Sequence, residues 1–451
     1  MESFTVGTGA SIYTQKLLPA ILTARHEIIL VTCFWAPSKT LTALCDALQH
    51  LARQRQADGA IHPLRMSICF SSRSLFQKLF HTSSVHGCVY SPSAWTSKMG
   101  LPSPEALASG NIELGVKSLF FLPFSVMHPK FLVVDRQRAF VPSCNVSWEA
   151  WFEGCLEISR KTPHHDPIDG LLGFYRTVWD NDFDLDAALP EWPDEQDGSR
   201  LSMVDHHVKE IIQSPAHASI KLVDIGVPSS AIEWLPGWHH RNPSLCFLPW
   251  QTPPAPDTPL NNTLLRLFEE ASRNIYIQTP NLTSPPVLSA IVETLARGVD
   301  VAIVTSQGMM LLEQLLTAST TTSWCIRSLT RRYRQMCSAI QARTNSQAQS
   351  RGDGNVDLEA QTITPGLLTV SYFRSRSGST SDEEPVHSHL KLSIFDGERT
   401  VLGSGNMDRA SWFTSQELGI LVQGASFAAA IKSTVDRALD GRVDPVFTIT
   451  S

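Results

Sequence analysis

Two stretches of the chain each place a histidine and a lysine two residues apart, before an apolar run that ends in an aspartate. This pattern, HxKxxxxD, occurs at two sets of positions: His128, Lys130 and Asp135, and then His389, Lys391 and Asp396. Residues i and i+2 of a β-strand share a face. Each histidine and its lysine are therefore predicted to project together from a strand that the apolar residues anchor in the core.

A serine and an asparagine follow each motif at the same distance, in "PSCN" (Ser143 and Asn145) and "GSGN" (Ser404 and Asn406). The residues before them look like the returning strand of a hairpin, which would bring each asparagine back beside its His–Lys pair. If the two copies met at this face, imidazoles, ammonium groups, amides and hydroxyls would surround one pocket.

Such a pocket suits a phosphodiester. Lysine charge and hydrogen bonds from asparagine and serine can hold the phosphate oxygens. Histidine has an unperturbed pKa of about 6.5, so one imidazole can attack phosphorus while the other protonates the leaving oxygen. We expect no metal and no cofactor, because the lysines neutralise the phosphate charge. The adjacent histidine pairs that begin at His164, His206 and His239 lack the spacing of a metal site.

The motifs belong to a diverged internal repeat. The His, Lys, Asp and Asn of the first motif all recur 261 residues later, and Trp412 follows Trp151 at the same offset. In both copies an apolar strand, an amphipathic helix and a second strand precede the motif. This order predicts an α/β fold, with two α/β/α halves forming a pseudo-twofold dimer within one chain. The expected boundaries are residues 1–185 for the first half, 186–245 for a linker and packing segment, and 246–451 for the second half.

The composition bounds the class of protein. The chain has 451 residues, 42% of them hydrophobic, and a net charge of −6. A dedicated nucleic-acid binder usually carries a basic face, so this charge argues mildly against one. The nine cysteines occur singly, no basic-then-apolar leader is visible, and no apolar run reaches 18 residues. We therefore expect a cytoplasmic protein with free thiols, no transmembrane span and at most peripheral contact with membranes.

The paired motifs resemble those of the phospholipase D superfamily, and the segment that begins at Ile275 resembles the second half of its cardiolipin-synthase-like members. The resemblance implies a covalent phosphohistidine intermediate that water or an alcohol then attacks. It also implies that His128 is the nucleophile, that His389 is the acid and then the base, and that Asp135 and Asp396 give structural support.

Within this family a glutamate after each asparagine fixes the tautomer of a histidine, as the acidic member of a catalytic triad does. Glu417 fits that place in the second copy. In the first copy Glu157 fits best, with one inserted residue, and Glu153 fits less well. Pro142 stands where the family usually has glycine, so a backbone N–H that could bind phosphate is missing there.

Two further features extend the expected site. Trp35 follows the first apolar strand, at the end where family members shape the substrate entrance, and is expected to contact substrate. The basic stretch from Arg327 to Met336 either binds phosphate or anionic lipid headgroups or is a solvated helix face.

The sequence thus favours a phosphodiesterase that acts on phospholipids by hydrolysis or phosphatidyl transfer. The alternative is a nuclease, or another nucleic-acid phosphodiesterase, that uses the same two-histidine chemistry.

Overall fold

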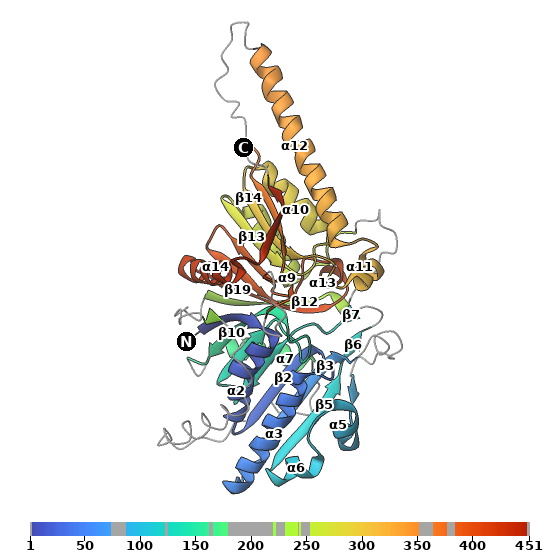
Figure 1. Cartoon of the computed structure of the whole chain (residues 1–451), viewed down its shortest axis with the longest axis vertical. Helices are drawn as coiled ribbons and strands as arrows, with labels where there is room; N and C mark the ends of the chain where they lie inside the picture. Colours follow the sequence, from blue (N-terminus) through green and yellow to red (C-terminus); the bar gives the residue numbers. More distant parts are fainter. Residues whose placement is uncertain are drawn as a thin grey trace.

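The computed structural model describes residues 2–73, 87–121, 125–161, 166–178, 220–221, 231–241, 243–244, 253–350, 364–376 and 384–448. Two α/β halves lie one above the other in Figure 1, with the first half in blue and green and the second in yellow to red. Among the described residues, no helix is both long and apolar enough to cross a bilayer.

The first half is built on a mixed sheet with the strand order β11-β1-β10-β9-β8-β2-β3-β5-β4. Strands β2, β3 and β5 are parallel to one another, whereas β8, β9 and β10 form the antiparallel part that carries the first motif. The bounds are β1 (Glu2–Thr8), β2 (Glu27–Phe34), β3 (Leu64–Ser72), β4 (Cys88–Val89), β5 (Ile112–Ser118), β8 (Phe131–Val134), β9 (Arg138–Pro142), β10 (Trp151–Ser159) and β11 (Ile220–Lys221). A small separate ribbon pairs β6 (Phe120–Phe121) with β7 (Ser125–Val126).

The second sheet repeats this plan in the order β12-β19-β18-β17-β13-β14-β15-β20. Its first strand lies within the segment expected to link the halves, so that segment supplies part of the second sheet. The bounds are β12 (Ile232–Trp238), β13 (Asn274–Thr279), β14 (Asp300–Ser306), β15 (Leu368–Phe373), β17 (Leu392–Phe395), β18 (Arg399–Gly403), β19 (Gln416–Gln423) and β20 (Val443–Thr448). The prediction of two α/β halves is confirmed, whereas the domain boundaries remain a prediction.

Helices cover the outer face of each sheet. In the first half these are α1 (Gly9–Ile12), a π-helical turn (Tyr13–Leu17), α2 (Leu18–Leu22), α3 (Lys39–Ala57), α5 (Pro92–Met99) and α6 (Pro104–Ser109). In the second half they are α9 (Pro259–Glu270), α10 (Pro285–Ala296), α12 (Thr322–Ser350) and α13 (Arg409–Phe413), and α11 (Leu311–Ala318) packs on α13. Helix α3 begins at its cap, where Ser38 Oγ accepts the Leu41 N–H, and it buries the four leucines whose helical spacing predicts it: Leu41, Leu44, Leu48 and Leu51.

The two halves share one hydrophobic core. Its buried residues come from the inner faces of both sheets, from Phe4 and Phe131 in the first half to Leu390 and Ile420 in the second. Two helices complete it, α7 (Pro167–Val178), which contacts β12, and α14 (Ala425–Leu439), which contacts β1. A core of this kind holds the halves in a fixed relative position, which a site made from both of them requires.

Composition alone misleads in one place. The polar residues 342–357 read as a flexible surface loop, but residues 342–350 extend helix α12, which projects from the second half in Figure 1. This part of the sequence lacks Gly and Pro, so nothing in it breaks a helix that has already begun. The remaining residues of that stretch lie outside the described part of the chain.

Candidate active site

Each HxK motif begins against a strand of the opposite half. The His128 N–H donates to the Gln416 carbonyl at 3.0 Å, beside a parallel bridge between Met127 and Gln416. The His389 N–H donates to the Phe152 carbonyl at 2.8 Å, next to β16 (His387–Ser388), which pairs in parallel with β10. In both cases the backbone partner is the residue just before a glutamate.

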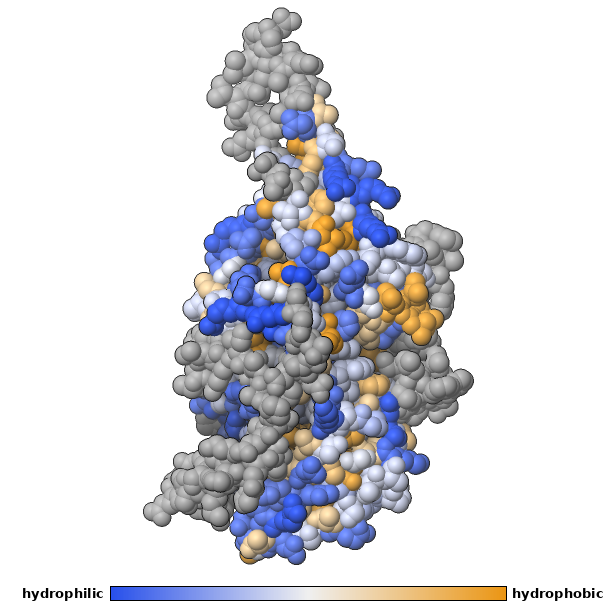
Figure 2. Space-filling view, in the orientation of Figure 1, coloured by the Kyte–Doolittle hydropathy of each residue, from blue (hydrophilic) through white to orange (hydrophobic). Residues whose placement is uncertain are grey.

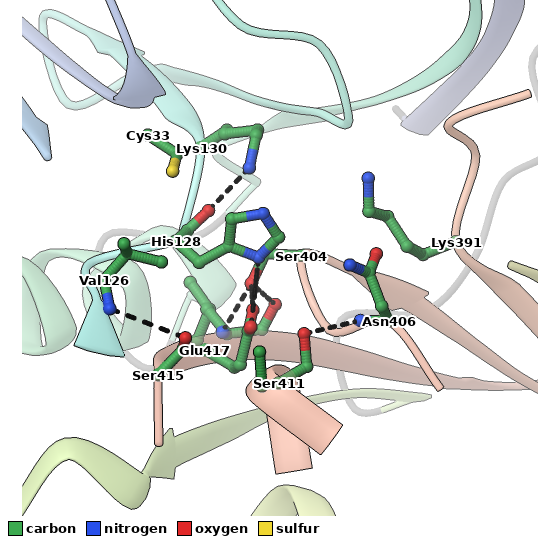
Figure 3. A network of polar contacts seen from close by, with 12 residues as sticks. Cys33, Val126, His128, Lys130, Lys391, Ser404, Asn406, Ser411, Ser415 and Glu417 are labelled. Atoms are coloured by element: carbon green, nitrogen blue, oxygen red, sulfur yellow. Dashed lines mark hydrogen bonds and ion pairs between the residues drawn. The ribbon is translucent and has the colours of Figure 1, made fainter. Parts of the chain in front are cut away.

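Those glutamates hold the two histidine rings, and they do so across the two halves. Nδ1 of His128 lies 2.9 Å from Glu417 Oε2, and Nδ1 of His389 lies 2.9 Å from Glu153 Oε1. An ionised carboxylate can only accept, so each Nδ1 carries a proton and each Nε2 keeps a lone pair. Figure 3 shows the His128 ring held by Glu417, with Lys391 and Asn406 beside it. Both rings thus have the tautomer that a nucleophile or a general base needs.

Glu157 is not the orienting carboxylate of the first copy, although its spacing favoured it. It bonds Ser3 at 3.0 Å, Lys16 at 3.0 Å and Arg138 at 2.7 Å. Burial raises its pKa, but the Arg138 and Lys16 bonds outweigh burial and lower the pKa to about 2. The weaker candidate, Glu153, holds the place instead.

The two serines act on the glutamates. Ser143 Oγ donates to Glu153, and Ser404 Oγ donates to Glu417. Each hydroxyl has one proton, which it donates to the carboxylate. The hydroxyl oxygen also accepts a hydrogen bond from a backbone N–H of the next strand at 2.9–3.0 Å. The prediction that these serines bind substrate is therefore corrected, since both are positioning residues behind the histidines.

The lysines are buried beside the histidines. Nζ of Lys130 donates to the His128 carbonyl, and Nζ of Lys391 donates to the His389 carbonyl, each at 2.7 Å. Burial lowers the pKa of both ammonium groups, and that of Lys391 falls to about 7, with the nearby Lys130 charge contributing. Two buried cations that repel one another are each less favourable in the charged form than a lysine in water.

The histidines differ in how deeply they are buried. The His128 side chain is 13% exposed and the His389 side chain 3%. Burial lowers the pKa of both histidines, and the charge of the nearby glutamate raises it by less. The net result is a lowered pKa in both cases, and that of His389 falls to about 3. Burial raises the pKa of Glu153 and Glu417, but the histidines outweigh it and leave both below the ordinary value. In the free protein both rings are therefore neutral near pH 7.

The two histidines line one cavity of about 40 Å³, large enough for roughly three water molecules by volume. Asn145 and Asn406 line it as well. Asn145 Oδ1 accepts the Phe34 N–H at 3.0 Å, and Asn406 Nδ2 donates to Asp408 at 2.9 Å. The Asn406 Oδ1 atom is buried and has no hydrogen-bond partner within the described residues, so an acceptor stands ready there for a bound hydroxyl.

The second half matches a family model described as cardiolipin synthase, PLD-like domain, over residues 264–439. That range contains the second motif with its Ser404, Asn406 and Glu417. The first half repeats the motif and the strand order around the same cavity. The second half of the chain thus carries a phospholipase D-like domain.

One solved structure agrees with this fold over almost the whole chain. The chain is similar to a phosphatidylserine synthase from Haemophilus influenzae Rd KW20, with 14% identity, 99% of this chain and 87% of that one covered, and a TM-score of 0.55. It also matches the phospholipase D family member Nuc from Salmonella typhimurium, with 14% identity, 48% of this chain and 96% of that one covered, and a TM-score of 0.28. At such identities the likeness concerns the fold. A comparison with curated proteins gave no match.

The departure from the phospholipase D pattern at Pro142 leaves the local geometry intact. The Ser143 N–H donates to the Gly154 carbonyl at 2.8 Å, and the Ser404 N–H donates to the Leu418 carbonyl at 3.0 Å. In the second half the equivalent of Pro142 is Gly403, whose φ is 141° and where an added Cβ atom would lie only 2.3 Å from the Leu418 oxygen, so a side chain is excluded. Both serines thus occupy matching places, although only one of the two preceding positions requires glycine.

The motif aspartates tie the turn after each motif strand to the start of a neighbouring strand. Asp135 accepts backbone N–H groups from Arg25, His26 and Glu27 at 2.7–2.9 Å. Asp396 accepts those of Ser272, Arg273 and Asn274 at 2.7–3.2 Å. Their contacts are those of supporting residues.

Trp35 does not line the cavity, contrary to expectation. It is 1% exposed, its Nε1 donates to the Met99 carbonyl at 2.9 Å, and its ring stacks on Phe70. The sequence missed the wall that the structure supplies, namely Trp148, Asn281 and the polar face of α11. Within this wall the side-chain amides of Asn281 and Gln314 are hydrogen-bonded to each other at 2.9 Å.

The described residues include no cluster of three or more His, Cys, Asp or Glu side chains that could hold a metal. His239, from one of the adjacent pairs, bonds the Ser415 carbonyl and Thr258, each at 3.0 Å, in the short 3₁₀ turn His239–Arg241. The pairs at His164 and His206 lie outside the described residues. Metal independence remains a prediction that a chelation experiment can test.

Proposed function

We propose that this chain is a phosphodiesterase or phosphatidyl-transferase that acts on phospholipids through a covalent phosphohistidine. The observation that carries the proposal is the crossed arrangement of two His–Glu pairs around one cavity. It supplies two imidazoles with the same tautomer, each with Nε2 available and each held by a buried carboxylate.

His128 is proposed as the nucleophile because it is the more exposed of the two rings. Its Nε2 lone pair forms the bond to phosphorus as the bond to the leaving oxygen breaks. The positive charge that develops on the ring lies beside Glu417, which stabilises it. His389 delivers a proton to the leaving alkoxide and becomes neutral.

The second step reverses the roles. Neutral His389 removes a proton from water or an alcohol, whose oxygen attacks phosphorus and displaces His128. The unpartnered Asn406 Oδ1 supports this step, because an acceptor that faces the cavity can receive the O–H of the attacking group. Water gives hydrolysis and an alcohol gives transfer.

The lysines are proposed to balance the charge of the phosphate. An anion bound between them raises the pKa of Lys130, Lys391 and His389, because each gains an opposite charge in a buried site. Binding therefore brings His389 toward the protonated form that the first step needs. In this scheme His389 takes up a proton as the phosphate anion binds.

Phospholipid is the proposed substrate class because the family match is to cardiolipin-synthase-like domains and the similar structure with the larger overlap is a phosphatidylserine synthase. A ³¹P NMR screen of mixed phospholipids and short DNA, with and without added alcohol, tests this directly. Turnover of phospholipid supports the proposal. Cleavage of DNA with no change in any lipid would contradict it and favour the nuclease alternative.

The covalent step is tested by intact-protein mass spectrometry after a short pulse with a p-nitrophenyl phosphodiester. His389→Asn should trap the adduct, because p-nitrophenolate leaves without a proton and the base that activates water is missing. His128→Asn should give no adduct. An adduct on His389 in the His128→Asn protein would reverse the assignment.

A further inference from the structure

Helix α11 forms one wall of the active-site cavity and presents an apolar face to solvent. Glu313, Gln314 and Thr317 line the cavity. The remaining turns carry four leucines whose exposed fractions are 45–62%, namely Leu311, Leu312, Leu315 and Leu316. The helix is therefore amphipathic in an unusual sense, since its polar face points inward to the site and its apolar face points outward.

Contacts at both ends hold this helix in place. Gln314 Nε2 donates to the Met309 carbonyl at 2.5 Å, and Gln314 Oε1 accepts the Thr322 N–H at 2.6 Å. Met310 and Ser319 flank the helix and both have φ near +50°. This left-handed conformation costs energy in a non-glycine residue, and here it turns the chain at each end of the helix. The leucines are thus held outward by a fixed framework.

The exposed apolar residues gather in one place. Ten large hydrophobic residues of the described chain are exposed, and five of them lie between Leu311 and Trp324. Figure 2 shows this cluster as an orange patch over α11. Scattered single residues need no explanation, but a contiguous patch at the mouth of a site indicates a binding surface.

A positive strip continues from this patch along α12. Trp324, which is 56% exposed, is followed on the same helix face by Arg327, Arg331 and Arg334, at spacings of three and four residues. The 29 residues of α12 include five arginines and no acidic residue. Figure 2 shows hydrophilic side chains gathered along α12 next to the orange patch. Leucines, a tryptophan and arginines in this order are typical of a surface that lies in a lipid interface.

We propose that α11 and the first turns of α12 are the surface with which this protein docks on an anionic phospholipid bilayer. The leucines enter the boundary between headgroups and acyl chains, Trp324 lies at the headgroup level, and the arginines contact anionic headgroups. This inference rests on the proposed lipid substrate, and it adds where the bilayer lies. Because the opposite face of α11 lines the cavity, a phospholipid reaches the histidines from the bilayer past this one helix.

Charge favours an anionic bilayer over an uncharged one. The whole chain carries a net charge of −6, so a uniform surface would be repelled by anionic lipid. The arginine strip reverses the sign locally, within the roughly 8–10 Å over which charge acts at physiological salt. Docking is therefore expected in one orientation, with α11 and α12 toward the membrane.

The test is flotation with vesicles of phosphatidylcholine alone or mixed with phosphatidylglycerol. The wild-type protein should float with the mixed vesicles. The double variant Leu312→Ser/Leu316→Ser should bind them at least about tenfold more weakly, because two inserted side chains are lost. Arg327→Gln/Arg331→Gln should lose the preference for phosphatidylglycerol and its dependence on salt.

Ile61→Ser is the matched control, since Ile61 is 86% exposed but lies in the first half, away from α11. It should bind vesicles like wild type. All variants should turn over a soluble p-nitrophenyl phosphodiester at the wild-type rate, because none of the changed residues lines the cavity.

Binding and chemistry are read separately, so the two proposals can fail separately. Vesicle binding that depends on the leucines, without conversion of any phospholipid, supports docking and contradicts the proposed function. Phospholipid turnover with equal binding by wild type and the leucine variant overturns docking alone. A wild-type dimer by light scattering that the leucine variant makes monomeric, with no vesicle binding, shows instead that the patch joins two copies and also overturns the proposal.

Discussion

The two halves carry the same motif on the same strand order, yet they surround their histidines differently. In the first half the chain runs from Asn145 to Glu153 through an irregular segment, and the Trp151 ring then lies 5.0 Å from the ring of His389. In the second half the path from Asn406 to Glu417 is three residues longer and contains helix α13. His389 is therefore the more enclosed histidine.

This difference shows that duplication supplied two equivalent imidazoles and that the connecting segments made them unequal. An enclosed ring with a low pKa is suited to moving a proton only when substrate is present. A more exposed ring with a free Nε2 is suited to attack. The proposed division of labour thus rests on the segments that connect each asparagine to its glutamate.

The largest effect should come from the crossed glutamates. Glu417→Gln should slow formation of the adduct, because Glu417 lies in the second half but orients His128 of the first half. Glu153→Gln should slow its hydrolysis, because Glu153 holds His389. Each loss should be about 10³-fold, since the histidine loses both its tautomer and a stabilising charge. Pulsed mass spectrometry and burst kinetics with p-nitrophenyl substrates separate the two steps.

Glu157→Gln is the control for this comparison. Its carboxylate bonds Lys16 and Arg138 and touches neither histidine, so activity should stay within about twofold of wild type. A slow first step in Glu153→Gln together with a slow second step in Glu417→Gln would contradict the crossed assignment of roles.

The second expected effect concerns pH. Lys391 has a pKa of about 7 in the free protein, so it is half charged at pH 7 and loses the rest of its charge as the pH rises further. Binding of an oxyanion must restore that proton, and affinity should fall by about tenfold per pH unit above 7. Calorimetric titration with tungstate between pH 7 and 9 measures this, for a change of about 100-fold.

Comparing the two lysines sharpens the test. Lys391→Met should make the dependence on pH less steep as well as weaken binding. Lys130→Met should weaken binding but leave a slope from Lys391. Affinity that is constant up to pH 9 in the wild-type protein would show that Lys391 keeps its charge there.

A smaller effect is expected at the serines. Ser143→Ala and Ser404→Ala each remove one hydrogen bond to a buried glutamate, which is worth about 1–2 kcal/mol. Each should lower turnover by about tenfold while the KM for a soluble substrate stays nearly constant, because the hydroxyl acts through the glutamate. A large rise in KM alone would instead indicate direct binding of substrate by the serine.

The smallest effect on chemistry is expected at the aspartates. Asp135→Asn and Asp396→Asn weaken the bonds to three backbone N–H groups and should lower the free energy of unfolding by about 1–3 kcal/mol. Turnover per folded molecule should stay within about twofold. Denaturant titration combined with activity measured at low temperature separates stability from catalysis.

The sequence identified the fold and the residues that lie on motif strands. His128, Lys130, His389 and Lys391 could be found because a constant offset of 261 duplicates them, and strand periodicity places each pair on one face. The same offset failed after the asparagines. It aligned Trp151 with Trp412, whereas Trp151 begins β10 and Trp412 is buried within α13.

That failure explains the error at Glu157. Three extra residues in the second half change the register, and only the strand pairing shows that Glu153 is the counterpart of Glu417. The sequence also could not predict that each histidine pairs with the glutamate of the opposite half. This pairing depends on a hydrogen bond between His128 and Gln416, two residues that are 288 positions apart. The wall made by α11 depends likewise on tertiary packing and carries no motif.

The exchanged backbone bonds between the halves have a consequence for the newly made chain. His128 is synthesised early, but its carboxylate partner arrives almost 290 residues later, and the strand that positions it arrives at the same time. Closing so long a loop is entropically costly and comes late in folding. A truncated or partly synthesised product therefore has His128 and Lys130 but no oriented ring, and the candidate site is complete only when the last third of the chain has joined the second sheet.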